Sequence, residues 1–179
     1  FVKTAYLIGD GQGYLSKDCE YICVESDEFR RHFAAYAPAY AIITNIEIDH
    51  VDYFKDEEDY FNAYQEFVNN VTKAVFYHGD DVWCRKLQFP VEAYSFGLNE
   101  GNDYSIADLQ ADSKGSQFDF LFKGEVIHHY SVPFVGDHLL IDTLGVLALA
   151  HHMGFDPDKV EEYLINNHKD VRRSCEIAY

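Results

Sequence analysis

Short apolar runs that are rich in β-branched and aromatic residues recur along the first half of the chain. They occupy residues 5–8, 21–24, 41–44, 74–77 and 91–96. Runs of nearly continuous apolar character are typical of strands in a sheet that is covered on both faces. We therefore predict a strand at each of these positions.

The apolar positions between the third and fourth runs recur at helical spacing. They are Tyr60, Phe61, Tyr64, Phe67, Val68 and Val71. This spacing lines one side of a helix over residues 57–71, so we predict an amphipathic crossover helix there. The order strand, helix, strand favours an α/β fold with a mostly parallel sheet flanked by helices.

The pattern changes after residue 104. Gly115 and Gly124 separate apolar segments at 118–122 and 126–132. Glycine between two strand-like segments favours a tight turn, so we predict an antiparallel hairpin appended to the parallel sheet.

Two helices are predicted near the end of the chain. Residues 139–153 are apolar nearly all round, which is typical of a buried helix. Asp156 followed by Pro157 is typical of a helix start, and this last helix is expected to run to about Asn166. One α/β domain over residues 1–179 is the simplest organisation.

Composition narrows the class of protein. The chain has 179 residues, of which 47% are apolar, and this is enough for a single core. A formal net charge of −17 disfavours nucleic acid and anionic membrane surfaces as partners. The four cysteines form no CxxC pair, and no apolar run is long enough to span a membrane, so a reducing cytoplasm is the expected compartment.

Polar groups follow two of the predicted strands. The first group is Glu25, Asp27 and Glu28, and the second is Asn45, Asp49, His50 and Asp52. Ligands of open α/β sheets gather at the carboxyl ends of strands, and Mg²⁺ prefers carboxylate oxygens. The two groups therefore predict a metal site, although acidic residues after a strand also occur as solvated loops or helix caps.

The second group carries a specific resemblance. Asn45, Asp49, His50 and Asp52 form the pattern Asn-x3-Asp-His-x-Asp, which resembles a motif of the Mur ligases. Residues 7–13, 25–28 and 43–46 look similar to the alanine-adding branch of that family in Gram-positive bacteria, and the similarity continues to about Glu176. The resemblance implies the fold of the central, ATP-binding domain of a Mur ligase.

The resemblance also implies roles for individual residues. Glu25 and His50 match the family's Mg²⁺ ligands, and Asn45 would orient phosphate or substrate beside them as a second catalytic residue. Asp49 and Asp52 would fix the His50 ring from outside the ligand set. His138, Asp142 and Arg173 match nucleotide-binding positions.

The family reaction supplies an expectation for the full-length protein. ATP activates the lactyl carboxylate of UDP-N-acetylmuramate as an acyl phosphate, and the amino group of L-alanine then displaces phosphate. ATP and Mg²⁺ are the implied cofactors, and peptidoglycan synthesis is the implied process. An N-terminal UDP-binding part and a C-terminal domain of the same protein would be the partners of this domain.

The chain departs from the family in three segments. No Gly-Lys-Thr phosphate-binding loop occurs in these residues, so this fragment alone is expected to be inactive. Leu139 and Asp142 stand where the family's adenine-contacting segment has Asn, and Asp142 cannot donate to a ring nitrogen. Ser174 interrupts the basic stretch that contains Arg173.

Two alternative functions therefore remain open. One is the related ligase that recycles murein peptide onto the same UDP sugar. The other is a degenerate, non-catalytic homologue that acts as a binding module. Residues 63–66 contain no lysine, whereas other branches of the family carry a carbamylated lysine in this helix, and this absence favours the alanine-adding branch.

Overall fold

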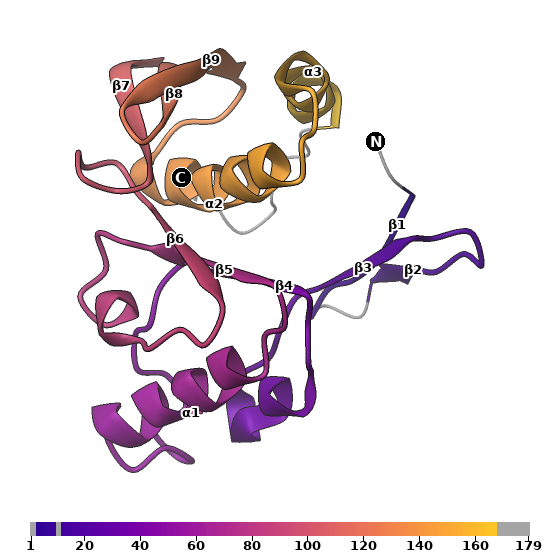
Figure 1. Cartoon of the computed structure of the whole chain (residues 1–179), viewed down its shortest axis with the longest axis vertical. Coiled ribbons are helices and arrows are strands. Elements are labelled where there is room, and N and C mark those ends of the chain that lie inside the picture. The colour runs from indigo at the N-terminus through magenta and orange to yellow at the C-terminus, as the bar shows by residue number, and fades with distance from the viewer. Residues whose placement is uncertain (1–2, 10–11, 168–179) are drawn as a thin grey trace, which may run out of the picture. The chain divides into compact units, whose positions relative to one another are not determined.

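The computed structural model describes residues 3–9 and 12–167 of the chain (Figure 1). The fold divides into two compact units. The first unit comprises Phe1–Val75 and Asp81–Ala93, and the second comprises Phe76–Asp80 and Tyr94–Tyr179. The organisation as one domain therefore stays a prediction. Within the described residues, no helix is long and apolar enough to cross a lipid bilayer.

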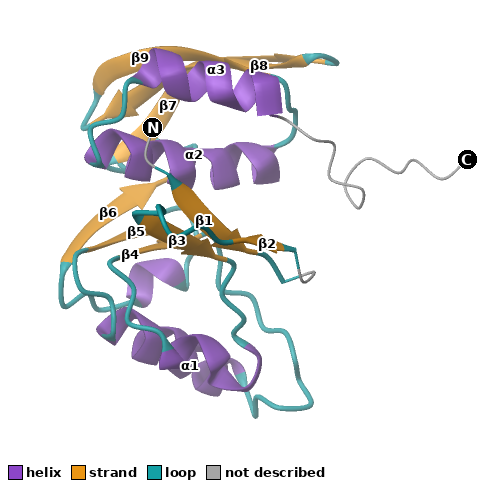
Figure 2. Ribbon diagram, turned by 90° about the vertical axis from the view of Figure 1, so that its right-hand side faces the viewer, coloured by secondary structure: helices purple, strands orange, loops and turns teal. Residues whose placement is uncertain are grey.

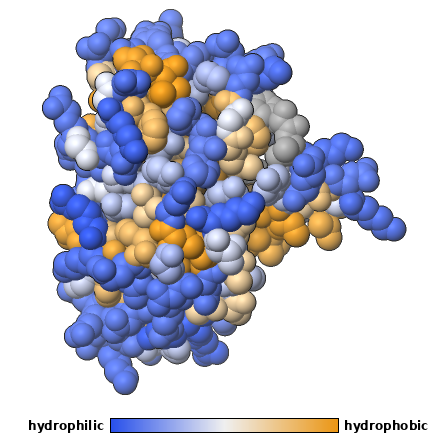
Figure 3. Space-filling view, in the orientation of Figure 1, coloured by the Kyte–Doolittle hydropathy of each residue, from blue (hydrophilic) through white to orange (hydrophobic). Residues whose placement is uncertain are grey.

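A small sheet opens the first unit. Its strands are β1 (Thr4–Leu7), β2 (Gly13–Tyr14) and β3 (Tyr21–Val24), in the order β2-β1-β3. β1 pairs with β3 in parallel and with β2 in antiparallel orientation. Figure 3 shows apolar surface over this sheet, and Tyr6 and Leu7, whose side chains alternate between its faces, are 43% and 49% exposed.

A six-stranded sheet follows, in the strand order β4-β5-β6-β7-β8-β9. The strands are β4 (Tyr40–Ile43), β5 (Ala74–His78), β6 (Glu92–Phe96), β7 (Tyr104–Asp112), β8 (Gly115–Phe122) and β9 (Glu125–Val132). β6 and β7 pair in parallel, whereas β7, β8 and β9 pair in antiparallel orientation. The mixed sheet and its helices confirm the predicted α/β class.

The appended antiparallel element is larger than the single hairpin that we predicted. It is a three-stranded meander, because β7 pairs with β8 along most of its length. Only the first three residues of β7, Tyr104 to Ile106, are buried, and in the rest apolar and polar residues alternate and are largely exposed. A half-exposed strand produces no continuous apolar run, which explains why the sequence pattern did not indicate β7 separately.

The predicted crossover helix is present as α1 (Glu57–Asn69), in the first unit. The Asp56 side chain caps it by accepting a hydrogen bond from the Asp59 amide at 2.8 Å. A short 3-10 helix, η1 (Phe29–Ala35), packs beside α1 (Figure 2). The rings of Phe33 and Phe67 stack there, with their centroids 4.9 Å apart. A second 3-10 turn, η2, covers Cys84–Lys86.

The last two helices belong to the second unit. They are α2 (Asp137–His152) and α3 (Pro157–Asn167), close to the predicted bounds. Figure 2 shows both helices on one side of the β7–β9 meander. The core of this unit is aromatic and aliphatic: Tyr104, Phe118, Phe120, Leu140, Leu144 and Leu147 are all almost fully buried.

Candidate metal centre

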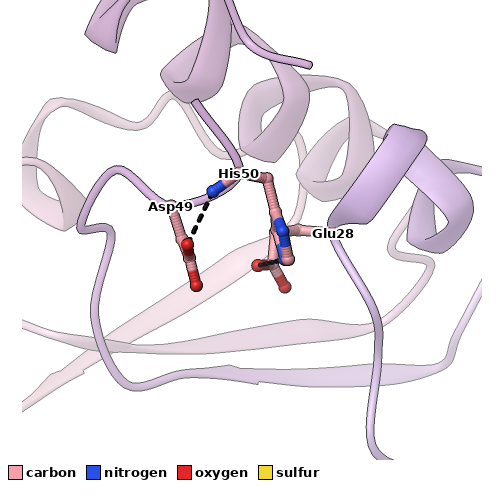
Figure 4. A group of neighbouring side chains, drawn as sticks. All are labelled: Glu28, Asp49 and His50. Carbon is pink, nitrogen blue, oxygen red and sulfur yellow. Dashed lines mark hydrogen bonds and ion pairs between the residues drawn. The ribbon is translucent and has the colours of Figure 1, made fainter. Parts of the chain in front are cut away.

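Three side chains converge in the first unit, from two loops that follow strands. Glu28 lies after β3 at the start of η1, and Asp49 and His50 lie in the loop after β4 (Figure 4). One ligand atom from each of the three lies within 4.8 Å of the others. Glu28 Oε1 and His50 Nε2 are 3.4 Å apart. Residues of the two strand-end groups therefore meet in the structure.

The backbone and the neighbouring rings fix the position of His50. His50 has a φ of 54°, in the left-handed region, and its amide donates to Asp49 Oδ1 at 2.6 Å. Its carbonyl accepts from the amides of Tyr53 and Phe54, which close the loop. The Phe29 ring lies 4.7 Å from the imidazole, centroid to centroid. An L-residue at positive φ is strained, and a strained residue that its surroundings hold in place is typical of functional sites.

The cluster borders a cavity of about 440 Å³. Its lining residues are Glu28, Asn45, Glu47, Ile48, Asp49, Tyr60 and Tyr64. Carboxylate oxygens and an imidazole are donors that suit a hard or borderline divalent cation, and the open cavity leaves room for waters or phosphate oxygens. The residues present therefore fit a site for Mg²⁺ or Mn²⁺.

Glu25 lies in a different environment from the one that we expected. Its Oε2 accepts a hydrogen bond from the Gly9 amide at 2.8 Å, which ties the end of β3 to the end of β1. Among the described residues, the carboxylate that joins His50 in the cluster is Glu28, three residues further along the chain. The ligand role of Glu25 stays a prediction.

The other predicted site residues fall into different parts of the chain. Asn45 is exposed and lines the cavity, and Asp52 is exposed on the same loop. His138 and Asp142 lie on α2 in the second unit. Arg173 lies outside the described residues.

Asp142 is an exposed residue of α2 whose carboxyl is partly desolvated by its neighbours. Burial raises the pKa of its carboxyl, although the nearby charges of His138 and His78 act in the opposite direction. His78 is a neighbour that sequence reasoning did not identify. It follows the apolar run over residues 74–77, and no motif distinguishes it.

Sequence reasoning also missed Tyr60 and Tyr64 as site residues. Both fit the apolar stripe of α1, and both line the cavity with their hydroxyl-bearing side chains. The available signal was their position on the helix that follows the Asn-x3-Asp-His-x-Asp motif. Tyrosine at a core position carries a hydroxyl that needs a partner when it is buried.

Comparisons with known proteins identify the family of this chain. The family model described as the Mur ligase middle domain matches residues 13–150. The UDP-N-acetylmuramate–L-alanine ligase of Lactococcus lactis subsp. cremoris (strain SK11) is 42% identical over 175 residues, which cover 98% of this chain and 40% of that protein. The chain thus spans about 40% of the length of the curated relatives that it matches.

Solved structures share the fold. The structure of the UDP-N-acetylmuramate–alanine ligase of Thermotoga maritima matches with a TM-score of 0.77 at 20% identity, over 92% of this chain and 38% of that one. The UDP-N-acetylmuramate:L-alanyl-gamma-D-glutamyl-meso-diaminopimelate ligase of Neisseria meningitides matches with a TM-score of 0.79 at 22% identity, over 96% and 59%. The family model covers most of the chain, and the chain therefore belongs to the Mur ligase family, whose middle domain it contains.

Proposed function

We propose that this chain is the central domain of an ADP-forming ligase that joins L-alanine to UDP-N-acetylmuramate in the cytoplasm, as a step of peptidoglycan synthesis. The observation that carries the proposal is the meeting of Glu28, Asp49 and His50 beside a polar cavity, which Glu28 and Asp49 line. The 42% identity with a UDP-N-acetylmuramate–L-alanine ligase supports the choice of substrates. ATP would supply the energy, and other parts of the same protein would complete the sites for the UDP sugar and the amino acid.

The cluster would hold Mg²⁺ through Glu28 and His50, with Asp49 as a further oxygen donor. When bound, Mg²⁺ neutralises negative charge on the transferring phosphoryl group. Asn45, at the cavity wall, would donate its side-chain amide to a phosphate or carboxylate oxygen and so orient the substrate. Phe29 packs on the His50 ring and limits its rotation, which keeps the imidazole nitrogen directed at Glu28.

Nucleotide recognition would involve α2. His138 is exposed near the start of this helix, where it can contact a base or ribose. Asp142 can accept a hydrogen bond from the exocyclic amine of adenine, but it offers no donor for a ring nitrogen. We therefore propose weaker adenine recognition than a pair of asparagines would provide. Arg173 is a further candidate contact for phosphate.

The test is an ADP-release assay on the full-length protein with ATP, Mg²⁺, UDP-N-acetylmuramate and L-alanine. We expect turnover that requires alanine and that His50→Ala abolishes. His32→Ala is the matched control, because His32 is an exposed histidine whose ion-pair partner is Asp27, outside the cluster. Its activity should stay near the wild-type value.

The same assay separates the two alternatives. Turnover with murein tripeptide in place of alanine would assign the protein to peptide recycling. No turnover with either amine, in the presence of intact nucleotide and metal, would identify a non-catalytic binding module. Three residues at which the chain departs from the family favour this last outcome: Leu139, Asp142 and Ser174.

A further inference from the structure

We propose that Tyr60 and Tyr64 form a hydroxyl chain that holds the Glu28 carboxylate in the orientation required for a divalent cation. The inference rests on the proposed function, because it concerns the same cluster. It adds two positioning residues on α1 that carry no charge. Neither residue is one of the proposed ligands.

A continuous series of polar contacts in the first unit links the two tyrosines to the cluster. Tyr60 Oη lies 3.4 Å from Glu28 Oε1, the same oxygen that lies 3.4 Å from His50 Nε2. Tyr60 Oη also lies 3.4 Å from Tyr64 Oη. These distances are longer than the roughly 2.7–2.8 Å of a typical O–H···O bond, and such bonds at active sites often shorten only when the site is occupied.

The number of hydroxyl protons fixes which group donates in each hydrogen bond of the hydroxyl chain. Glu28 is an acceptor when it is ionised, so Tyr60 must donate to it. The single hydroxyl proton of Tyr60 is then engaged in the hydrogen bond to Glu28. The Tyr64 hydroxyl must therefore donate to Tyr60. Both donors point toward the anionic group, and each bond polarises the next in the same sense.

The tyrosines are suited to remain donors. Tyr60 is only 4% exposed. An ordinary phenol keeps its proton near neutral pH, so both hydroxyls can act as donors. A protonated phenol is a permanent neutral donor, whereas a lysine in its place would compete with the cation for the carboxylate.

The rings are held in place by α1 and its neighbours. Tyr60 and Tyr64 are one helical turn apart, with ring centroids at 5.3 Å, and Phe54 packs edge-on against Tyr60 at 4.8 Å. Tyr64 also contacts Phe33 of η1 at 5.2 Å. The hydroxyls therefore have little freedom, and the Glu28 side chain loses little further entropy when a cation binds.

The experiment is a Mn²⁺ titration of this chain, with free Mn²⁺ followed by electron paramagnetic resonance. Tyr60→Phe removes the hydroxyl and keeps the ring, and we expect it to weaken Mn²⁺ binding by about tenfold, the lower end of the range for partners that orient metal ligands. Tyr64→Phe should weaken binding less, because it acts through Tyr60. Tyr130→Phe, at another buried tyrosine in the second unit, should leave the affinity unchanged.

The outcomes distinguish the proposed metal site from the proposed hydroxyl chain. If the wild-type chain binds Mn²⁺, His50→Ala abolishes binding and Tyr60→Phe binds as tightly as wild type, the hydroxyl chain is wrong and the metal site stands. If the wild-type chain does not bind Mn²⁺, both proposals fail together. Unfolding temperatures measured in EDTA control for a general loss of structure: equal values for wild type and Tyr60→Phe mean that the affinity change is local.

Discussion

Glu28 Oε1 lies 3.4 Å from His50 Nε2, although the two residues come from loops after different strands. Glu25, which also follows β3, instead accepts a hydrogen bond from the Gly9 amide. Two carboxylates of one short segment thus have distinct surroundings. One borders the cavity with a histidine, and the other joins the ends of β1 and β3.

This difference predicts unequal effects of two matched substitutions. Glu28→Gln should weaken Mn²⁺ binding by about tenfold or more, because it removes the anionic oxygen nearest His50. Glu25→Gln should leave Mn²⁺ affinity nearly unchanged, since the Gln carbonyl can still accept from Gly9. Isothermal titration of both variants measures this. If Glu25→Gln weakens Mn²⁺ binding and Glu28→Gln does not, Glu25 is the metal ligand and Glu28 is not.

Cation binding should stabilise the folded chain. A ligand that binds only the native state adds RT ln(1 + [L]/Kd), or about 2.7 kcal/mol at a hundredfold excess over Kd. We therefore expect MnCl₂ to raise the unfolding temperature of wild type and EDTA to reverse the rise. His50→Ala should show no rise, and an equal rise in this variant would mean that Mn²⁺ binds elsewhere.

Arg31 is expected to stabilise the packing of η1 against α1. Its guanidinium donates to Asp59 Oδ1 at 2.6 Å and forms an ion pair with Glu66 at 2.8 Å. Arg31→Met should lower the free energy of unfolding by about 2 kcal/mol, since charge-assisted hydrogen bonds are lost from a partly buried position. Urea denaturation measures the change. Arg30→Met is the control, because Arg30 is exposed; equal losses in both variants would contradict this role.

Asp142 should make stability depend on pH. Burial raises the pKa of its carboxyl in the folded state, so folding disfavours the charged form. Stability is then lost as pH rises from the unfolded pKa, near 4, through the raised folded value. Asp142→Asn should therefore raise the unfolding temperature at pH 7 but not at pH 3.

Asp137→Asn is the matched control for the Asp142 prediction. Asp137 lies in the first turn of the same helix, where a negative charge is favourable. This variant should show no gain at pH 7, as measured by thermal melts across the pH range. A gain for Asp142→Asn that is the same at pH 3 and pH 7 would rule out the titration of this group as its cause.

The sequence predicted the elements whose apolar residues are continuous or strictly periodic. The expected helix over 57–71 is α1, and the apolar run over 139–153 forms most of α2. It did not predict η1, because Arg30 and Arg31 adopt left-handed backbone angles that no local pattern indicates. It also did not predict β2, which is only two residues long.

The site was predicted in part. The sequence indicated polar groups after β3 and after β4, and the structure brings Glu28 of the first group together with His50 of the second. It could not distinguish Glu28 from Glu25, because that choice depends on where η1 directs the chain. It also could not show that the hydroxyls of Tyr60 and Tyr64 reach the cavity, since tyrosine fits the core side of a helix equally well.

The most direct test of the metal site is the anomalous scattering of Mn²⁺ in crystals of this chain soaked in MnCl₂. We predict an anomalous difference peak within coordination distance of both Glu28 and His50. This peak should be absent from crystals of His50→Ala. A peak beside Glu25, or no peak in the cluster at saturating Mn²⁺, would contradict the account.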